Sequence, residues 1–358
     1  MRKLLRVVGA IALAILILCA IPVAGVELTC RAPASEAAAF TPLVDPLDRR
    51  SEGDSFLSYP EWYIVHAYAD LAGVTRQGSE SDFDYVAAVR GFWTSLCGAT
   101  RQASMIGSAT LDQRVTDYII GLSFTAEMAI KGAWEWTIGA ATAWLRGSQR
   151  TAEDDYALAV ADRYAAFLQQ TPWYRFPFAT TLRDFWTNVP VDGSHRPRKI
   201  ERRIALTLEW GGKALYAQAM AALAGASPAD LRIRSVVRGL TRDDLAAMPQ
   251  IVPIRTLDDD LTLVETPRYE AFTDILRALA ARERNVVEIA GNRRILTTVI
   301  ARHDGTLDTG GATILFSLPI QSRPDWRRVG LASDVGQLTA QIGLMDRQGA
   351  SFEHAYDY

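Results

Sequence analysis

The sequence predicts an N-terminal transmembrane helix, then an all-α helical domain and finally a C-terminal α+β domain. Three observations lead to this fold class: an early uncharged apolar run, a long region of helical periodicity, and short β-branched segments in the last third. The expected parts are an anchor over residues 1–25, a linker over 26–55, a helical membrane-proximal domain over 56–226 and an α+β domain over 227–358.

The apolar run covers residues 7–24 and follows three basic residues. Because an α-helix rises about 1.5 Å per residue and a bilayer core is about 30 Å thick, this length suffices for a slightly tilted span. A cleaved secretory signal is the alternative, since Val23, Ala24 and Gly25 suit a cleavage site, although signal cores are usually about 7 to 15 residues long. The flanking charges predict a cytoplasmic N-terminus and an extracytoplasmic main body.

The amino-acid composition of the chain argues against several classes of function. Hydrophobic residues make up 49% and charged residues 22% of the 358-residue chain, which is typical of globular proteins. The net charge of -3 argues against nucleic acid as a partner, because duplex binding depends on neutralising phosphates. Three cysteines in the chain form no C-x-x-C pair, so we expect neither a bound metal nor a cofactor.

The pairing of Cys30 with Cys97 stays open at this point. An exported body would bring both thiols into an oxidising compartment, where a disulfide persists. The alternative is one surface thiol and one thiol packed within a helix. Sequence alone does not bring the two backbones within disulfide range.

Capping and periodicity predict the helices of the first half. Ser58, Pro60 and Glu61 announce a helix over residues 60–71, because they supply a cap, a first-turn proline and a carboxylate three residues after the cap. Further helices are expected from Ser81 or Asp82 to Cys97, from Leu111 to Trp144, from Thr151 to Gln170, around Asp184 to Trp186, and from Pro197 to Ala226.

The helix expected over residues 111–144 carries Glu127, Lys131 and Glu135 at four-residue spacing, so these charges form one stripe on an otherwise apolar surface. Three environments fit this pattern: the core of a soluble bundle, the headgroup layer of a membrane, or a second span over residues 119–145. The second span would place the α+β domain in the cytoplasm.

The last third alternates between strand and helix signals. Strands are expected over residues 231–237, 251–255, 261–266, 286–289, 294–300 and 313–320, with a helix over 269–284. This order suggests a ferredoxin-like two-layer sandwich, and the sequence shows no internal repeat.

The chain lacks the local signatures of phosphate loops, dinucleotide-binding turns, zinc proteases and serine hydrolases. The best candidate site is the segment SYPEWYIVHAYAD, because helical spacing places its polar and aromatic residues on adjacent turns. His66, oriented by Asp70 and close to Tyr63, is a candidate general base or metal ligand, and Trp62 is a candidate ligand contact. The structural alternative packs the aromatic rings into the bundle and pairs His66 with Asp70.

Two other segments are candidate contact sites. The basic cluster at the start of the last predicted helix opposes the helix dipole, so an anionic lipid headgroup is a candidate partner for Arg198, Lys199, Arg202 and Arg203. A solvated basic face that is partly paired with carboxylates from other helices is the alternative. The aromatic segment TPWYRFPF includes Trp173 and Tyr174, which either line a ligand groove or wedge between helices.

The function expected from these features is that of a membrane-anchored envelope protein with a binding or scaffolding role. Its expected partners are the lipid bilayer, through the N-terminal helix, and an envelope protein. The alternative is a membrane-associated enzyme that acts on a lipophilic or small-molecule substrate through the His66 region.

Overall fold

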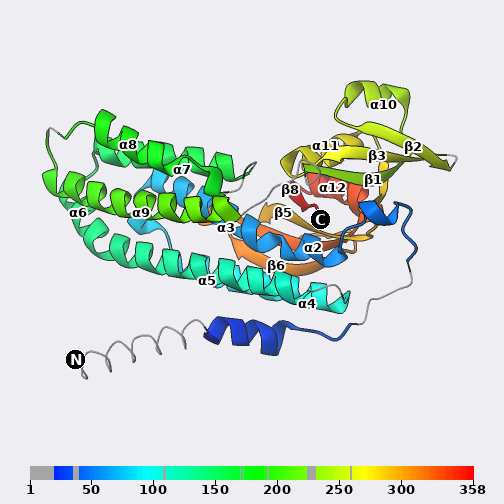
Figure 1. The fold of residues 1–358 in the computed structure, drawn as a ribbon, viewed down its shortest axis with the longest axis horizontal. Coiled ribbons are helices and arrows are strands. Elements are labelled where there is room, and N and C mark those ends of the chain that lie inside the picture. The colour runs from blue at the N-terminus through cyan, green and yellow to red at the C-terminus, as the bar shows by residue number, and fades with distance from the viewer. Residues whose placement is uncertain are drawn as a thin grey trace.

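The computed structural model describes residues 20–34, 40–107, 110–169, 171, 173–191, 193–223, 231–258 and 260–358, and it consists of a helical half and a half built on two sheets (Figure 1). Residues 20–25 are helical and continue into a π-helical turn, η1 (Val26–Cys30). Most of the predicted anchor, residues 1–19, lies outside the described residues. Among the helices that are described, which include residues 119–145, none has the length and apolar character needed to cross a membrane.

The helical half has the mixture of long and short helices expected from the sequence. Its α-helices are α2 (Glu52–Leu57), α3 (Tyr59–Gln77), α4 (Tyr85–Met105), α5 (Leu111–Trp134), α6 (Ala140–Arg146), α7 (Ala152–Leu168), α8 (Phe178–Asn188) and α9 (Arg196–Leu223). Short turns of 3-10 helix lie at η2 (Pro46–Asp48), η3 (Glu80–Asp82) and η5 (Trp173–Arg175).

Local capping explains several of these boundaries. Pro60 lies in the first turn of α3, as predicted. Thr151 and Asp154 form a reciprocal capping box at the start of α7, where the sequence predicted a helix start. The long helix predicted over 111–144 is interrupted by a π-helical turn, η4 (Glu135–Gly139), before it continues as α6.

The second half contains two four-stranded antiparallel sheets. The first has the order β2-β3-β1-β4 and the second the order β6-β7-β5-β8. The elements are β1 (Arg232–Arg238), α10 (Arg242–Ala247), β2 (Val252–Asp258), β3 (Leu261–Pro267), α11 (Glu270–Ala281), β4 (Asn285–Ile289), β5 (Arg294–Arg302), β6 (Thr313–Pro319), β7 (Trp326–Asp334), η7 (Val335–Gln337), α12 (Leu338–Arg347) and β8 (Ser351–Tyr356).

The two sheets repeat one topology. Each is built from three strands, a helix and a fourth strand, and in each the first strand lies between the third and the fourth. The register shifts repeat as well. The first strand shifts register against the fourth at Val236/Val237 in the first sheet and at Thr298/Val299 in the second. The second strand shifts register against the third after Pro253 in the first sheet and after Ile314 in the second. The chain therefore contains a structural duplication that its sequence does not reveal.

The α+β class is confirmed, but the expectation of a single ferredoxin-like sheet is wrong. Sequence analysis missed α10, β7, α12 and β8 in this half. Strand β7 begins with Trp326, Arg327 and Arg328 and contains a glycine, and β8 is the short segment SFEHAY, so neither shows a run of β-branched residues. Because β7 and β8 were missed, sequence analysis could not predict the second sheet.

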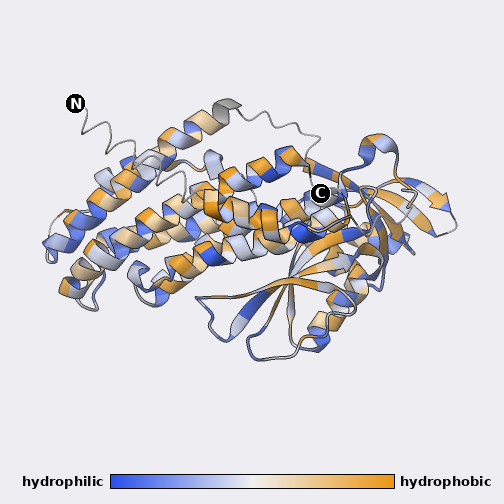
Figure 2. Ribbon diagram, turned by 90° about the horizontal axis from the view of Figure 1, so that it is seen from below, coloured by the Kyte–Doolittle hydropathy of each residue, from blue (hydrophilic) through white to orange (hydrophobic). Residues whose placement is uncertain are grey.

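Two hydrophobic cores organise the molecule. One contains the helical half together with residues of the second sheet such as Leu296, Phe316 and Tyr356. The other contains α11, α12 and side chains from both sheets, for example Ile233 and Val299. The strands carry both hydrophobic and hydrophilic residues (Figure 2), and both faces of β5 are buried, because Leu296 packs into the first core and Val299 into the second.

Residues 42–50, which we call the strap, lie on the first sheet. The backbone N–H groups of Leu43 and Val44 donate to Glu288 at 2.7 and 3.0 Å, and the N–H of Arg50 donates to the carbonyl of Ala290 at 3.0 Å. Asp48 pairs with Arg234 at 2.7 Å. This part of the predicted linker is therefore packed against the body.

Candidate functional site

His66 lies on α3 at the contact with the second sheet. Its Nε2 is 3.0 Å from the hydroxyl of Tyr356, which in turn is 2.9 Å from the hydroxyl of Thr298. Its Nδ1 is 3.9 Å from Glu353. The imidazole thus joins the helical half to strands β5 and β8 through hydrogen bonds made inside the protein.

Burial and the charge of Arg328 keep the imidazole of His66 neutral. Arg328 donates two hydrogen bonds to Glu353, at 2.6 and 2.7 Å. Burial, with Arg328 nearby, lowers the pKa of His66 to about 3. Burial opposes the ionisation of Glu353, but Arg328 outweighs it and lowers the pKa of that carboxyl to about 2. The arrangement places an ion pair, whose side chains are 13% and 20% exposed, beside a neutral imidazole.

The predicted hydrogen bond between His66 and Asp70 is wrong, whereas Tyr63 packs into the helical core as the structural alternative expected. Asp70 accepts the backbone N–H groups of Gln321 and Ser322 at 2.7 and 2.6 Å, so it fixes the turn after β6. The hydroxyl of Tyr63 donates to the carbonyl of Ala88 at 2.6 Å. Tyr63, His66 and Asp70, which lie about one turn apart on α3, therefore contact three different parts of the protein.

Trp62 does accompany His66, but its nearest ring belongs to a residue that sequence analysis missed. The ring centroids of Trp62 and His354 lie 3.9 Å apart, against 6.1 Å for Trp62 and His66. His354 is also 3.0 Å from Glu270. The partners of α3 at this contact come from β7 and β8, and only a correct assignment of these strands could have indicated them.

The aromatic segment around η5 acts as a wedge. Phe176 and Phe178 are buried, and their rings lie 4.9 and 5.3 Å from Tyr164. Trp173 and Tyr174 are partly buried against the same core, and Trp173 lies 5.0 Å from the ring of Tyr216. The segment is thus packed between α7 and α9, as the structural interpretation proposed.

The basic cluster of α9 is buried and not solvated, but its predicted pairing with carboxylates from other helices is confirmed. Arg198 pairs with Asp154 at 2.8 Å, and Arg203 pairs with Glu153 at 3.0 Å. Arg202, which is 1% exposed, pairs with Glu80, Glu135 and Glu201, and Lys199 is buried as well. The positive charges are compensated by carboxylates of other helices and of α9 itself.

The charge stripe predicted on α5 belongs to the same network. Glu127 pairs with Lys213 at 2.8 Å and Lys131 with Glu209 at 2.9 Å, while Glu135 pairs with Arg202 at 2.6 Å. The stripe therefore pairs with α9 across the helix contact instead of pairing along α5. We call this alternating set of charges the α5–α9 ion-pair network.

The outer surface of these helices has the opposite character. Between residues 113 and 145, all of which the structure describes, no charged side chain is exposed, whereas Ile130 is 73% and Trp144 is 81% exposed. The side chains described between residues 197 and 220 follow the same rule, with Leu208 68% and Leu215 72% exposed. Charges inside and apolar residues outside invert the usual pattern of a water-exposed bundle.

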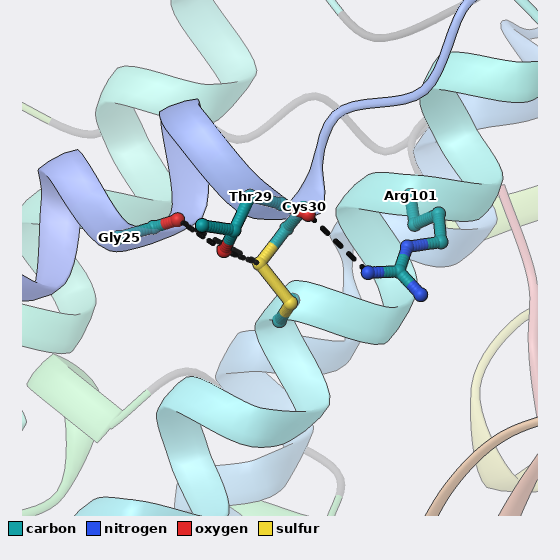
Figure 3. Close-up of a disulfide and its surroundings, with 5 residues drawn as sticks. Gly25, Thr29, Cys30 and Arg101 are labelled. Atoms are coloured by element: carbon teal, nitrogen blue, oxygen red, sulfur yellow. Dashed lines mark hydrogen bonds between the residues drawn. A yellow bond between two sulfur atoms is a disulfide. The ribbon is translucent and has the colours of Figure 1, made fainter.

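Cys30 and Cys97 form a disulfide between η1 and α4, so the interpretation as two free thiols is wrong (Figure 3). Their Cα atoms are 5.1 Å apart, within the normal range. Arg101 of α4 donates to the carbonyl of Thr29 at 3.3 Å, and Tyr118 of α5 donates to Glu27 at 2.7 Å. The segment that follows the apolar run is therefore fixed to α4 and α5.

The described residues contain no group of three or more His, Cys, Asp or Glu side chains arranged to hold a metal ion. Comparison with protein-family models, curated proteins and solved structures found no significant match for this chain.

Proposed function

We propose that the protein is a membrane-anchored envelope protein with a binding or scaffolding role, in which the helical half lies next to the bilayer and the two-sheet half faces away from it. The observation that carries this proposal is the uncharged outer surface of α5, η4, α6 and α9. Large exposed apolar patches on a protein mark surfaces that interact with other proteins or with membranes. Tryptophan side chains such as Trp136 and Trp144 favour the membrane interface.

The disulfide supports an extracytoplasmic location for the body. Disulfides persist in oxidising compartments and are rare in the cytosol. Cys30 follows the apolar run by six residues, and its partner Cys97 lies in the helical half. Both sulfurs would therefore lie on the far side of the membrane from a cytoplasmic N-terminus.

The enzyme alternative lacks a comparable observation. The side chain of His66 is 12% exposed, and its Nε2 is hydrogen-bonded to Tyr356 at the contact between α3 and the second sheet. A general base must instead lie within reach of a substrate proton. We therefore retain the binding or scaffolding role.

Topology and membrane contact test the proposal separately. Compartment-sensitive reporters fused after Pro33, Arg150 and Tyr358 in three separate fusion proteins should all report the extracytoplasmic side. A cytoplasmic signal after Tyr358 would contradict it.

For membrane contact, the full chain is reconstituted into vesicles that contain phospholipids brominated in the acyl chain. Bromine quenches indole fluorescence at short range, and Trp144→Phe should reduce the quenched fraction. Trp326→Phe in β7 is the matched control, and because it removes an unquenched indole it should not lower that fraction. Equal effects of the two variants would argue against a bilayer contact by the helical half.

A further inference from the structure

Further ion pairs join the α5–α9 ion-pair network to charges on η3, α6 and α7, and we call this larger set the extended network. Its carboxylates are Glu80, Glu127, Glu135, Asp154, Glu201 and Glu209, and its cations are Lys131, Arg146, Arg198, Arg202 and Lys213. Arg150 lines a small cavity with Glu80, but it donates to backbone carbonyls and pairs with no carboxylate among the described residues. The extended network therefore has one carboxylate in excess of its cations.

The hydrogen bonds indicate which carboxylate is in excess. Both oxygens of Glu201, of Asp154 and of Glu209 accept hydrogen bonds. Glu135 accepts at Oε1, from Nη2 of Arg202 at 2.6 Å, whereas its buried Oε2 has no hydrogen-bond partner among the described residues. A carboxyl group that carries a proton on one oxygen and accepts at the other has this arrangement.

The surroundings of this oxygen leave room for no ligand larger than a proton. Glu135 is 2% exposed and is the first residue of the π-helical turn η4. Its Oε2 lies against the backbone of Gly139, the last residue of the same turn, where a Cβ would collide with it. π-Helical turns are rare and are frequently found at functional sites.

Charged and titratable groups surround the Glu135 carboxyl on four neighbouring elements. They are Glu80 on η3, Tyr85 on α4, Lys131 on α5, and Glu201 and Arg202 on α9. Burial and the charge of Glu80 raise the pKa of Glu135 to about 7, although Arg202 opposes them. Burial also opposes the ionisation of Glu80, but Lys131 and Arg202 outweigh it and lower the pKa of that carboxyl. The surplus proton is thus held on Glu135 and not on Glu80.

Contacts from α9 fix the turn at both ends. The indole N–H of Trp134, just before η4, donates to Glu201 at 2.6 Å, and Nη1 of Arg198 donates to the carbonyl of Gly139 at 3.2 Å. Ionisation of Glu135 would add a buried negative charge for which the extended network has no further cation, which is unfavourable. An arrangement in which η4 opens and water reaches the carboxylate relieves this cost.

We propose that Glu135 is a proton-binding site that couples pH to the packing of η4 and α6 on α9. With the proton on Oε2 the turn stays packed, and loss of the proton favours the open arrangement. The inference goes beyond the proposed function and does not depend on it, because these contacts lie inside the helical half. Trp136 and Ile138, on the exposed side of η4, carry the change to the outer surface.

Infrared spectroscopy of the full chain, in a detergent without carbonyl groups, tests the bound proton. The band of protonated carboxyl groups that is lost between pH 6 and pH 8 should be weaker in Glu135→Gln than in the wild type. The loss that remains belongs to carboxyls such as Asp117, whose pKa burial raises to about 8. Asp162→Asn, in an exposed pair with Arg76, is the matched control and should behave like the wild type. Equal losses in the wild type and Glu135→Gln would overturn the proposal.

A second variant tests the origin of the proton affinity and keeps Glu135 in place. Glu80→Gln removes the carboxylate that raises the pKa of Glu135, so the Glu135 part of the band should be lost at lower pH than in the wild type. An unchanged titration would contradict the role of the surplus carboxylate.

Hydrogen exchange tests the coupling to η4 and α6. If the open carboxyl titrates at its ordinary value of 4.5, the protection factors of residues 135–146 should fall about tenfold between pH 6 and pH 8. These factors correct for the intrinsic pH dependence of exchange. They should stay constant in Glu135→Gln, and those of α12 should stay constant in both proteins. Constant protection of residues 135–146 in the wild type would overturn the coupling, and it would leave the topology and bromine-quenching tests of the proposed function unaffected.

Discussion

The two four-stranded sheets share one topology, yet different parts of the chain cover them. The helical half packs on the second sheet, where Leu296, Phe316 and Tyr356 join its core. The strap lies on the first sheet, where Val44 packs with Val236 and Leu263. The two sheets therefore show that strand topology does not determine which part of the chain covers a sheet. A few side chains on one face of each sheet determine it.

Equivalent positions show how the faces diverged. Gly330 pairs with Thr298 in the second sheet, and Leu263 pairs with Val236 at the same place in the first. The ring of Phe316 lies against Gly330, and the position equivalent to Phe316 is Arg255. Gly330 thus makes room for the ring of Phe316 at the position where the helical half packs on the second sheet.

The two sheets also differ in charge at a pair of equivalent positions. The covered second sheet contains the ion pair of Arg328 and Glu353, whereas the register places Leu261 and Val287 at the equivalent positions of the first sheet. The ion pair lies beneath α3 beside His66. Buried ion pairs add little net stability compared with apolar side chains of similar size, but the loss of one partner is costly.

The largest effect is therefore expected from Glu353→Val, which places the residue of the first sheet in the second. The variant leaves Arg328, whose side chain is only 13% exposed, without its carboxylate and should lower the free energy of unfolding by about 3 kcal/mol, measured by denaturant titration. The double variant Arg328→Leu with Glu353→Val should recover most of that loss. No recovery would show that the two sheets are not interchangeable at this pair.

Gly330→Leu should cost about 3 kcal/mol in the same titration, because a Cβ at this position would lie 2.1 Å from the ring of Phe316. The combination of Gly330→Leu with Phe316→Arg copies the first sheet and should loosen the docking of α4 on β6, visible as faster hydrogen exchange in α4. Leu263→Gly in the first sheet is the reciprocal control and should leave exchange in α4 unchanged.

Much of the helical half could be predicted because its signals are local. The cap of α7 at Thr151 and the proline at the start of α3 depend on residues within one turn. The pairing of Glu135 with Arg202 could not be predicted, because it joins residues 67 positions apart. The stripe on α5 indicated that its charges needed partners, and only the fold shows that α9 supplies them.

The pH dependence of stability offers a third test of the contact between α3 and the second sheet. The pKa of His66 is held at about 3, below its ordinary value of 6.5, so its neutral form stabilises the folded protein above pH 6.5 and this contribution is lost as the pH falls toward 3. Wild-type protein should lose about 2 kcal/mol more than His66→Gln between pH 7 and pH 5. His303→Gln, at an exposed turn, should behave like the wild type; a parallel loss in His66→Gln would exclude His66 as the source.

The candidate site shows where sequence reasoning reaches its limit. The helical periodicity of α3 correctly grouped Trp62 and His66, but it also grouped Asp70, which faces the turn after β6. Spacing along a helix tells which residues share a side, and it does not tell which neighbour each one meets. That information came from β8, whose six residues carry too weak a strand signal to be recognised alone.

The smallest effect is expected at the strap. Glu288 is fully buried and accepts both strap N–H groups, so Glu288→Gln, which keeps only one acceptor oxygen, should cost about 1 kcal/mol. Because the strap covers only the first sheet, amides 43 and 44 should exchange about fivefold faster while those of α3 and α4 stay protected. Asp45→Asn, which alters an exposed pair with Arg255, is the matched control. Uniformly faster exchange in α3 as well would mean that the two sheets are coupled, and that the first sheet, despite its lighter cover, supports the docking of the helical half.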